Sequence, residues 1–345
     1  MKEEVKELWK LCFDDNDEFV EMYFRLRYSS ETTMTIQSGN KVVSSLQMPY
    51  YPMTFEGIEI QTAYISGACT HPDFRGKGVM SQLLAESFSR MVQKNIPLSI
   101  LIPANRGLYD YYAKTGYAPA FFRTPIEENV SDIPANKGNL QFKHITSFDK
   151  SLFDYCTEKA YSRPNYVQHT AEDFKAIMED LRIGGGSAIL AQHPSDGNPG
   201  AAPRCRGVLF AYPEDNYLKV SDCFADNNTI RDSLIREAAH HYDLSTIVRY
   251  ELPEHSDKEE PFGMARIIHA KMILHLYAAT HPDKQININL TDEQLTFNTG
   301  YYYINKGTCT FSKKPLEGEH LELSTQELST LIFDEVRLYM SLMLE

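Results

Sequence analysis

The spacing of apolar residues predicts helices at the start of the chain. Two groups of apolar residues recur every three or four positions, separated by the acidic stretch 14–17. Apolar residues at this spacing cover one face of an α-helix. We therefore expect two short amphipathic helices, carried by Val5, Leu8, Trp9 and Cys12 and by Phe19, Met22, Tyr23 and Leu26.

The hydrophobic period changes after these helices. β-Branched residues flank the turn 38–41, which predicts a hairpin, and the stretch TAYISGACTHP predicts a further strand. A glycine-containing loop follows, and then an amphipathic helix over residues 79–94. PLSILIPAN predicts a buried strand, and RGLYDYYAKTG predicts a short helix that ends at Gly116. This order predicts one compact α/β unit over residues 1–130.

A linker-like stretch over residues 129–139, rich in Pro, Gly and Asn, leads into a second α/β region over residues 131–258. The glycine-rich segment RIGGGSAI in this region precedes a strand and not a helix, so we expect no second phosphate-binding loop. The pattern predicts helices over 151–159, 171–181 and 230–242 and strands over 187–192 and 206–212.

The third region covers residues 259–345 and follows a charged connector, PEHSDKEEPFG. MARIIHAKMILHLYAA predicts a helix that begins near Met264, and Ser324 and Glu327 form a capping box ahead of a last helix. The tail VRLYMSLMLE is so rich in apolar residues that we expect it to pack into the protein. Strands are predicted over 285–290, 293–300 and 309–312.

Composition excludes several classes of protein. The chain has 34 Lys and Arg against 47 Asp and Glu, a net charge of −13, which disfavours nucleic acid as a partner. No apolar run approaches the length of about 18 residues that a membrane helix needs, and the charged N-terminus lacks the pattern of a signal peptide. The six cysteines form no C-x-x-C pair, so free thiols in a cytoplasmic protein are expected.

The segment HPDFRGKGVMSQLL carries the most informative chemistry. Two glycines and two cations stand directly before an amphipathic helix, where acidic or small polar side chains are usually preferred. Backbone N–H groups of a glycine-rich turn at a helix N-terminus form a cradle for an anion. The segment fits neither a Walker loop nor a dinucleotide fingerprint, but it fits R-x-x-G-x over Arg75–Val79. We therefore expect a phosphate-binding site here.

Two motifs resemble those of the GNAT superfamily of acetyl-CoA-dependent N-acetyltransferases. Arg75 and Gly78 match its R/Q-x-x-G-x-G/A loop, although Met80 replaces the final small residue. Further along, N-x6-Y-x3-G-[FY] is reproduced from Asn105 to Tyr117. The resemblance implies a mixed α/β (α+β) GNAT fold with acetyl-CoA as co-substrate.

The whole chain is similar to acetyltransferases of the Eis (enhanced intracellular survival) type. That resemblance implies a catalytic GNAT domain over 1–130, a degenerate second GNAT-like domain over 131–258 and a sterol-carrier-protein-like domain over 259–345. It also implies a possible homo-oligomer.

By the same resemblance, Tyr112 protonates the departing thiolate, with Tyr109 or Tyr111 as alternative donors. The resemblance also implies that the cofactor contacts the end of the preceding strand, the glycine loop and the starts of the two helices that follow. These residues are Ala68, Cys69, Thr70, Arg75, Gly76, Lys77, Gly78, Val79, Met80 and Asn105. Cys69 on its own reads more simply as a strand cysteine than as a nucleophile.

The general base is the least defined part of the expected site. In the Eis-like family the C-terminal carboxylate reaches the catalytic pocket, which points to Glu345 here, although a merely packed terminus is an equal alternative. The adjacent pair His240–His241 has no accompanying ligand cluster, and no zinc or serine-hydrolase motif occurs, so no metal is expected.

The acceptor is expected to be a small-molecule amine. Aromatic residues could form walls of the acceptor pocket, and acidic residues could attract a polyamine- or aminoglycoside-like cation, although packing and solvation explain both groups as well. Acetylation of protein lysines, or an apolar-ligand carrier with a vestigial GNAT domain, are the alternatives. The aromatic group is Tyr23, Phe24, Tyr28, Tyr50 and Tyr51, and the acidic group is Asp14, Asp15, Asp17, Glu18 and Glu21.

Overall fold

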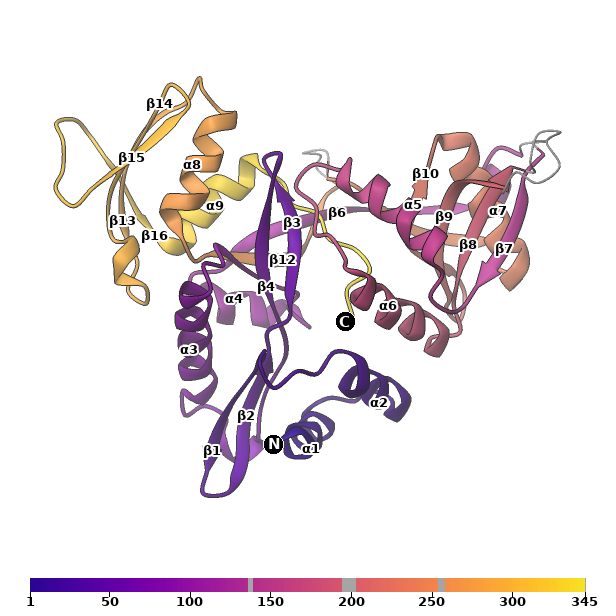
Figure 1. The fold of residues 1–345 in the computed structure, drawn as a ribbon, viewed down its shortest axis with the longest axis horizontal. Helices are drawn as coiled ribbons and strands as arrows, with labels where there is room; N and C mark the ends of the chain where they lie inside the picture. Colours follow the sequence, from indigo (N-terminus) through magenta and orange to yellow (C-terminus); the bar gives the residue numbers. More distant parts are fainter. Residues whose placement is uncertain (136–138, 194–202, 254–257, 345) are drawn as a thin grey trace.

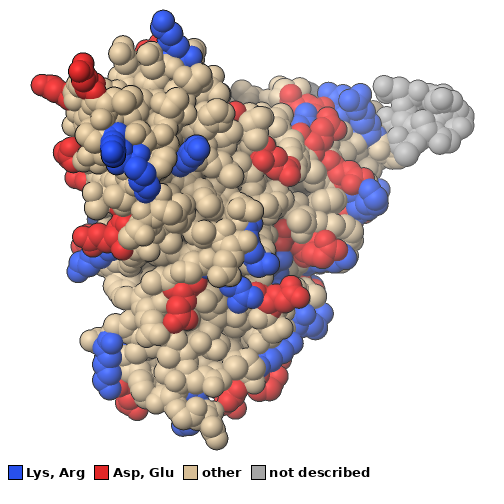
Figure 2. All heavy atoms as spheres, turned by 60° about the vertical axis from the view of Figure 1, so that its left-hand side comes forward, with Lys and Arg blue, Asp and Glu red and all other residues tan. Residues whose placement is uncertain are grey.

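A computed structural model describes residues 1–135, 139–193, 203–253 and 258–344. These residues form a mixed α/β protein with one large sheet of 12 strands and one small sheet of 4 strands (Figure 1). None of the helices in these ranges is long and apolar enough to cross a membrane. Figure 2 shows acidic and basic side chains interspersed over one face of the molecule.

The first region begins with the two expected helices and continues into the large sheet. Its elements are α1 (Lys2–Cys12), α2 (Asp17–Leu26), β1 (Thr33–Ser38), β2 (Lys41–Gln47), β3 (Tyr50–Phe55), β4 (Ile58–Thr70), α3 (Val79–Gln93), β5 (Leu98–Leu101), α4 (Arg106–Ala113) and β6 (Ala118–Asn129). The predicted hairpin is confirmed by the antiparallel pairing of β1 with β2. β4 and β5 run parallel because α3 carries the chain back across the sheet.

The second region repeats this plan of a helix pair, antiparallel strands, a crossover helix and a parallel strand. Its elements are β7 (Gln141–Ile145), α5 (Lys150–Tyr161), α6 (Ala171–Ile183), β8 (Ser187–His193), β9 (Arg204–Pro213), β10 (Leu218–Ala225), α7 (Asn228–Tyr242) and β11 (Thr246–Glu251). β10 and β11 are parallel across α7, as β4 and β5 are across α3. The fold is therefore a tandem of two GNAT-like units.

The sheet is continuous through both units, in the order β1-β2-β4-β5-β12-β6-β11-β10-β9-β8-β7, with β3 also on β4. β12 (Glu260–Ile267) lies between β5 and β6 although it follows them by more than a hundred residues. The expected helix from Met264 is wrong over its first residues, because Met264–Ile267 belong to this strand and the helix begins at Ala270.

The last region packs a four-stranded sheet against two helices. Its elements are α8 (Ala270–Thr280), β13 (Gln285–Thr291), β14 (Gly300–Asn305), β15 (Thr308–Ser312), β16 (Leu321–Ser324) and α9 (Thr325–Glu335), with sheet order β15-β14-β13-β16. The expected capping box at Ser324 and Glu327 is confirmed. The strand expected over 293–300 is wrong: Thr296–Asn298 is a 3-10 turn, and the strand is β14.

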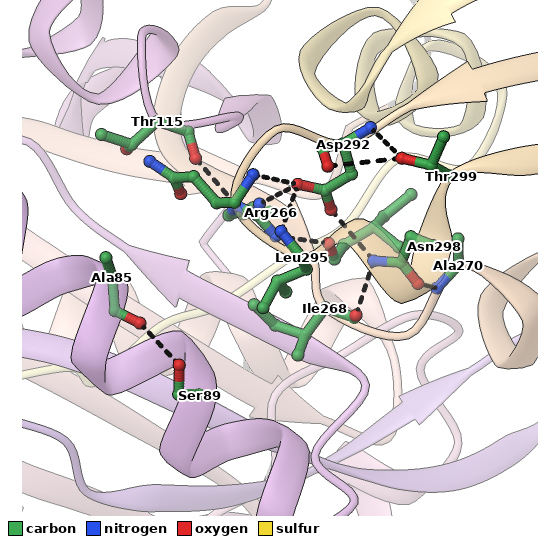
Figure 3. Close-up of polar contacts among 12 residues, drawn as sticks. Ala85, Ser89, Thr115, Arg266, Ile268, Ala270, Asp292, Leu295, Asn298 and Thr299 are labelled. Atoms are coloured by element: carbon green, nitrogen blue, oxygen red, sulfur yellow. Dashed lines mark hydrogen bonds and ion pairs between the residues drawn. The ribbon is translucent and has the colours of Figure 1, made fainter.

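A buried arginine, ion-paired within the last region, also bonds to the first. Arg266 on β12 donates to the Oδ1 of Asp292 at 2.9 Å and to the carbonyl of Thr115, after α4, at 2.7 Å (Figure 3). Asp292 also accepts from the backbone of Leu295 at 2.9 Å and from the side chain of Asn298 at 3.0 Å. Both charged side chains are 1% exposed. The pair is thus fully desolvated, and each charge depends on the other.

Candidate functional site

The candidate site is a cavity of about 400 Å³ at the point where two parallel strands diverge. β4 pairs with β5 from Thr62 to Ile65, and this pairing ends at Leu101. Beyond it, residues 66–68 and 102–104 line opposite sides of the cavity. The topology of a crossover unit therefore produces an opening in the sheet, with α1 and α2 on one side and α4 on the other.

Gly67 makes the bend in β4 possible. Its φ is +54°, and a Cβ built on it would come within 2.0 Å of the Trp9 ring. The pairing of β2 with β4 shifts register between Ser45 and Gln47, so Gly67 and Ala68 form a bulge. At Gly67 the strand therefore has no side chain, and the Trp9 ring packs against its backbone, with Ser66 and Ala68 beside it in the lining of the cavity. The bulge and the closely packed Trp9 ring together account for a glycine at this position.

The loop predicted to bind phosphate has two glycines with left-handed backbone geometry. Gly76 and Gly78 have φ values of +71° and +76°, in the left-handed region that favours glycine, and space around each is open within 4 Å. Gly78 is the N-cap of α3, and the first turn of that helix carries no acidic residue. Val79 and Met80 open the helix. The first amides of α3 therefore have no side-chain cap, and the space beside the two glycines is open.

The side chains of the two loop cations fold back onto the backbone that precedes the glycines. Arg75 Nε donates to the carbonyl of Thr70 at 3.0 Å, and Lys77 Nζ donates to the carbonyl of Asp73 at 2.7 Å. The Lys77 ammonium also lies 5.1 Å from the ring centroid of Phe74. Both cations thus add positive charge near the loop while they brace its backbone.

Tyr112 is the tyrosine of the second motif that lines the cavity. It is 8% exposed, and burial raises the pKa of its phenol to about 12, with neighbouring Tyr111 adding to the rise. Tyr109 instead donates to the carbonyl of Pro261 at 3.2 Å, and the hydroxyl of Tyr111 lies 3.4 Å from that of Ser81. Among the described lining residues of the cavity, neither alternative tyrosine appears.

The other predicted cofactor residues are divided between two faces of the strand. Ala68 lines the cavity, whereas Cys69 is buried and lies 3.3 Å from the hydroxyl of Ser45. The Thr70 hydroxyl meets that of Ser44 at 2.9 Å. Asn105 is the N-cap residue of α4 and follows directly on the cavity-lining segment 102–104.

Cys12, at the end of α1, was expected only on a helix face, but its thiol lies beside the start of the glycine loop. Its thiol donates to the carbonyl of Thr70 at 3.5 Å and accepts from Arg75 Nη2 at 3.7 Å. A hydrogen bond from Cys69 and the nearby Arg75 guanidinium lower the pKa of Cys12 to about 6. The same contact, together with burial, raises the pKa of Cys69. Nothing local in the sequence indicated this group, because its members come from three separate segments.

The C-terminal tail is held in place by backbone hydrogen bonds, as its apolar composition predicted. The amide of Leu338 donates to Ala120 at 3.0 Å, and the amide of Tyr339 donates to Asn165 at 2.9 Å. Leu344 is 7% exposed and lines the cavity. Figure 1 places this end of the chain between α2 and α6. Glu345, the predicted base, lies outside the described residues.

The acidic and aromatic groups expected around the acceptor are only partly in the cavity. Ion pairs join Asp17 to Lys10 at 2.5 Å and Glu18 to Arg182 at 2.6 Å, and Glu21 pairs with Lys6. Among the described residues that line the cavity, the acidic group contributes Asp15 and the aromatic group contributes Tyr23. Trp9, Phe13 and Phe19, not singled out for this role, line it as well.

The second unit lacks the chemistry of the phosphate loop. After β10, where the first unit has Arg75 and two glycines, the chain has Asp226 and Asn227. Asp226 pairs with Lys159 and Arg206, each at 2.7 Å, and Asn227 caps α7 through its own side chain. The Asn227 side chain already accepts from one of the first amides of α7, which an anion at this helix end would need.

Comparisons with known proteins agree with this geometry. Residues 2–120 match the family model described as acetyltransferase (GNAT) domain. No curated protein matches the sequence. Among solved structures, a GCN5-related N-acetyltransferase from Anabaena variabilis matches with TM-score 0.74 at 18% identity, over 96% of this chain and 87% of that chain.

Two further structures match over nearly the whole chain. A probable N-acyltransferase from Enterococcus faecalis gives TM-score 0.76 at 17% identity, and Eis1 from Mycobacterium abscessus gives 0.71 at 11% identity. Each match covers 96% of this chain and 87% of the other. The protein therefore has a tandem GNAT fold, and the match to the acetyltransferase (GNAT) domain model lies in its first unit.

Proposed function

We propose that this protein is an acetyl-CoA-dependent N-acetyltransferase that transfers acetyl directly to a primary amine of a cationic small molecule. The observation that carries the proposal is the cavity at the divergence of β4 and β5, with Tyr112 in its wall, in the same unit as the glycine loop. Such an arrangement can hold a thioester between an anion cradle and a proton donor.

Each part of the site has a chemical role in this proposal. Amides at Gly76–Met80 bind the pyrophosphate, Arg75 and Lys77 add positive charge, and the end of β4 at Ala68–Thr70 binds the pantetheine arm, with Asn105 beside it. Backbone amides at the Gly67 bulge polarise the thioester carbonyl.

Transfer needs a neutral amine and a protonated leaving group. The ammonium first gives one proton to a base, and the neutral nitrogen bonds to the acetyl carbon. As the carbon–sulfur bond breaks, the nitrogen releases a second proton to solvent, which restores the proton that Tyr112 gives up. Tyr112 gives its phenol proton to the departing thiolate, and its raised pKa keeps that proton in place at neutral pH. We propose the carboxylates of Glu345 as the base, supported by the tail that brings Leu344 to the cavity.

The finer assignments are proposals too. We propose that the chain is of the Eis type, with a sterol-carrier-protein-like last domain, a cytoplasmic location and a homo-oligomeric state; the likeness to Eis1 in fold supports the first of these. A polyamine- or aminoglycoside-like acceptor was the expectation from the acidic residues near the N-terminus.

Isothermal titration of acetyl-CoA into the wild type and an Arg75→Glu variant tests the proposal. We expect saturable binding that the variant weakens at least about tenfold, because it puts a carboxylate beside the pyrophosphate. Lys271→Glu, the same charge reversal at an exposed position on α8, is the control and leaves binding unchanged. No binding by the wild type would refute the proposal.

A further inference from the structure

The wall of the cavity on the side of α1 and α2 is aromatic. Trp9 is 4% exposed, and its ring centroid lies 4.8 Å from that of Tyr23 and 5.1 Å from that of Phe13. Phe19 stands behind Tyr23, with the ring centroids 6.1 Å apart. These rings come from one face of each helix and from the loop between them, so the helix pair builds the wall as a unit.

Trp9 is fixed at the centre of this wall. Its indole covers the backbone of β4, since a Cβ on Gly67 would meet its Cζ3 atom at 2.0 Å. Its Nε1 donates to Asp15 Oδ2 at 2.7 Å, which holds the ring from its other end. An acceptor that reaches the bulge at Gly67 therefore passes along an aromatic surface whose central ring, Trp9, is held by contacts at both ends.

The charge on the wall is small. Among the described residues that line the cavity, Asp15 carries the single ionised side chain; the others are aromatic, aliphatic, small or hydroxyl-bearing. The neighbouring acids that the sequence suggested for recognition are neutralised by Lys6, Lys10 and Arg182. A ligand with several ammonium groups would have to desolvate them beside aromatic rings. Of the described lining residues only Asp15 offers a carboxylate, and the carboxylates proposed as the base serve the reacting amine.

We infer that the acceptor is a monoamine carried on an apolar or aromatic body, and not a polycation. This inference rests on the proposed function and narrows its substrate class. The rings hold the apolar body, and an ammonium entering the cavity meets Asp15 and ring faces that attract cations.

The chain's single tryptophan, Trp9, makes binding directly observable by fluorescence. The probes are 2-phenylethylamine and spermidine, each titrated against the protein and each assayed as acceptor by release of coenzyme A thiol. We expect saturable quenching by 2-phenylethylamine and a kcat/KM at least about tenfold above that of spermidine, in the range by which apolar pockets discriminate.

Two variants test whether the wall is the cause. Phe13→Ala removes a ring that is only half-buried and should lower kcat/KM for 2-phenylethylamine about tenfold, with little change for spermidine. Phe297→Ala, at a 44%-exposed ring outside the cavity, is the matched control and should change neither value.

The outcomes separate the inference from the proposed function. Turnover of both amines with spermidine preferred, or equal effects of the two phenylalanine variants, overturns the inference and leaves the function standing. If acetyl-CoA does not bind and no amine is acetylated, the function fails. In that case, quenching of Trp9 by 2-phenylethylamine alone still supports the recognition chemistry, and quenching by spermidine alone overturns it.

Discussion

Removing the negative charge of Asp292 should destabilise the protein strongly. Asp292→Asn keeps the shape of the side chain but leaves the Arg266 guanidinium, 1% exposed, without a counter-ion. The new side chain also has an NH2 group in place of one carboxylate oxygen. That NH2 would face another donor, either the Arg266 guanidinium or the Asn298 amide, which in the wild type donates to Asp292 at 3.0 Å. Breaking a buried pair by removing one partner costs about 3–5 kcal/mol, whereas whole domains are stable by about 5–15 kcal/mol.

Urea unfolding followed by circular dichroism measures this cost. With an m-value of about 3 kcal/mol/M, a loss of about 3 kcal/mol lowers the midpoint by about 1 M. The control is Asp154→Asn, which breaks an exposed i,i+4 pair with Lys150 on α5 and should shift the midpoint by less than about 0.2 M.

The reasoning would be refuted by a midpoint for Asp292→Asn within about 0.2 M of wild type. A second arm separates charge from packing. In Asp292→Asn combined with Arg266→Met, the unpaired charge is gone, so part of the lost stability should return. Full recovery is not expected, because the carbonyl of Thr115 loses the 2.7 Å donor that Arg266 provides.

Three further changes test the site. Tyr112→Phe should lower kcat about 100-fold, while the affinity for acetyl-CoA, measured by titration, stays unchanged. Because the pKa of the Tyr112 phenol is about 12, its ionisation should not reduce wild-type activity below pH 10. A decline in activity centred near pH 10 that the variant lacks would contradict this. Gly67→Ala should shift the emission of Trp9 and lower the melting temperature, because the new Cβ overlaps the indole; an unchanged spectrum would count against the packing. Because its pKa is near 6, Cys12 is a thiolate above that pH, so its rate of alkylation by iodoacetamide should level off above pH 7. Burial raises the pKa of Cys309 to about 11, so its alkylation rate should still be rising at pH 9. Parallel rate profiles for the two cysteines, measured by mass spectrometry, would contradict this difference.

The parts of the fold that sequence predicted are those set by local patterns. Helical spacing located α1, α2 and α3, and the capping box at Ser324 located α9. The glycines of the loop could be recognised as turn residues, because few residues other than glycine adopt φ values near +70°. The tail was expected to pack because so dense an apolar run is costly to expose.

The parts that sequence did not predict depend on distant partners. Met264–Ile267 is a short apolar run that fits a buried strand as well as a helix, and only β5 and β6 on either side decide for the strand. The sequence likewise could not tell which acid near the N-terminus faces the cavity, because Arg182, the partner of Glu18, comes from α6.

The position of β12 has a consequence for how the chain is made. β6 ends at residue 129, but the strand that joins it to β5 begins at residue 260. At translation rates of about 5–20 residues per second, the ribosome needs roughly 7–26 s to synthesise the intervening chain. During that time β5 and β6 each offer an unpaired edge, the kind of surface on which nascent chains associate wrongly. The N-terminal unit, although it is made first, can complete its sheet only after the second unit has left the ribosome, so its folding is tied to the synthesis of its neighbour.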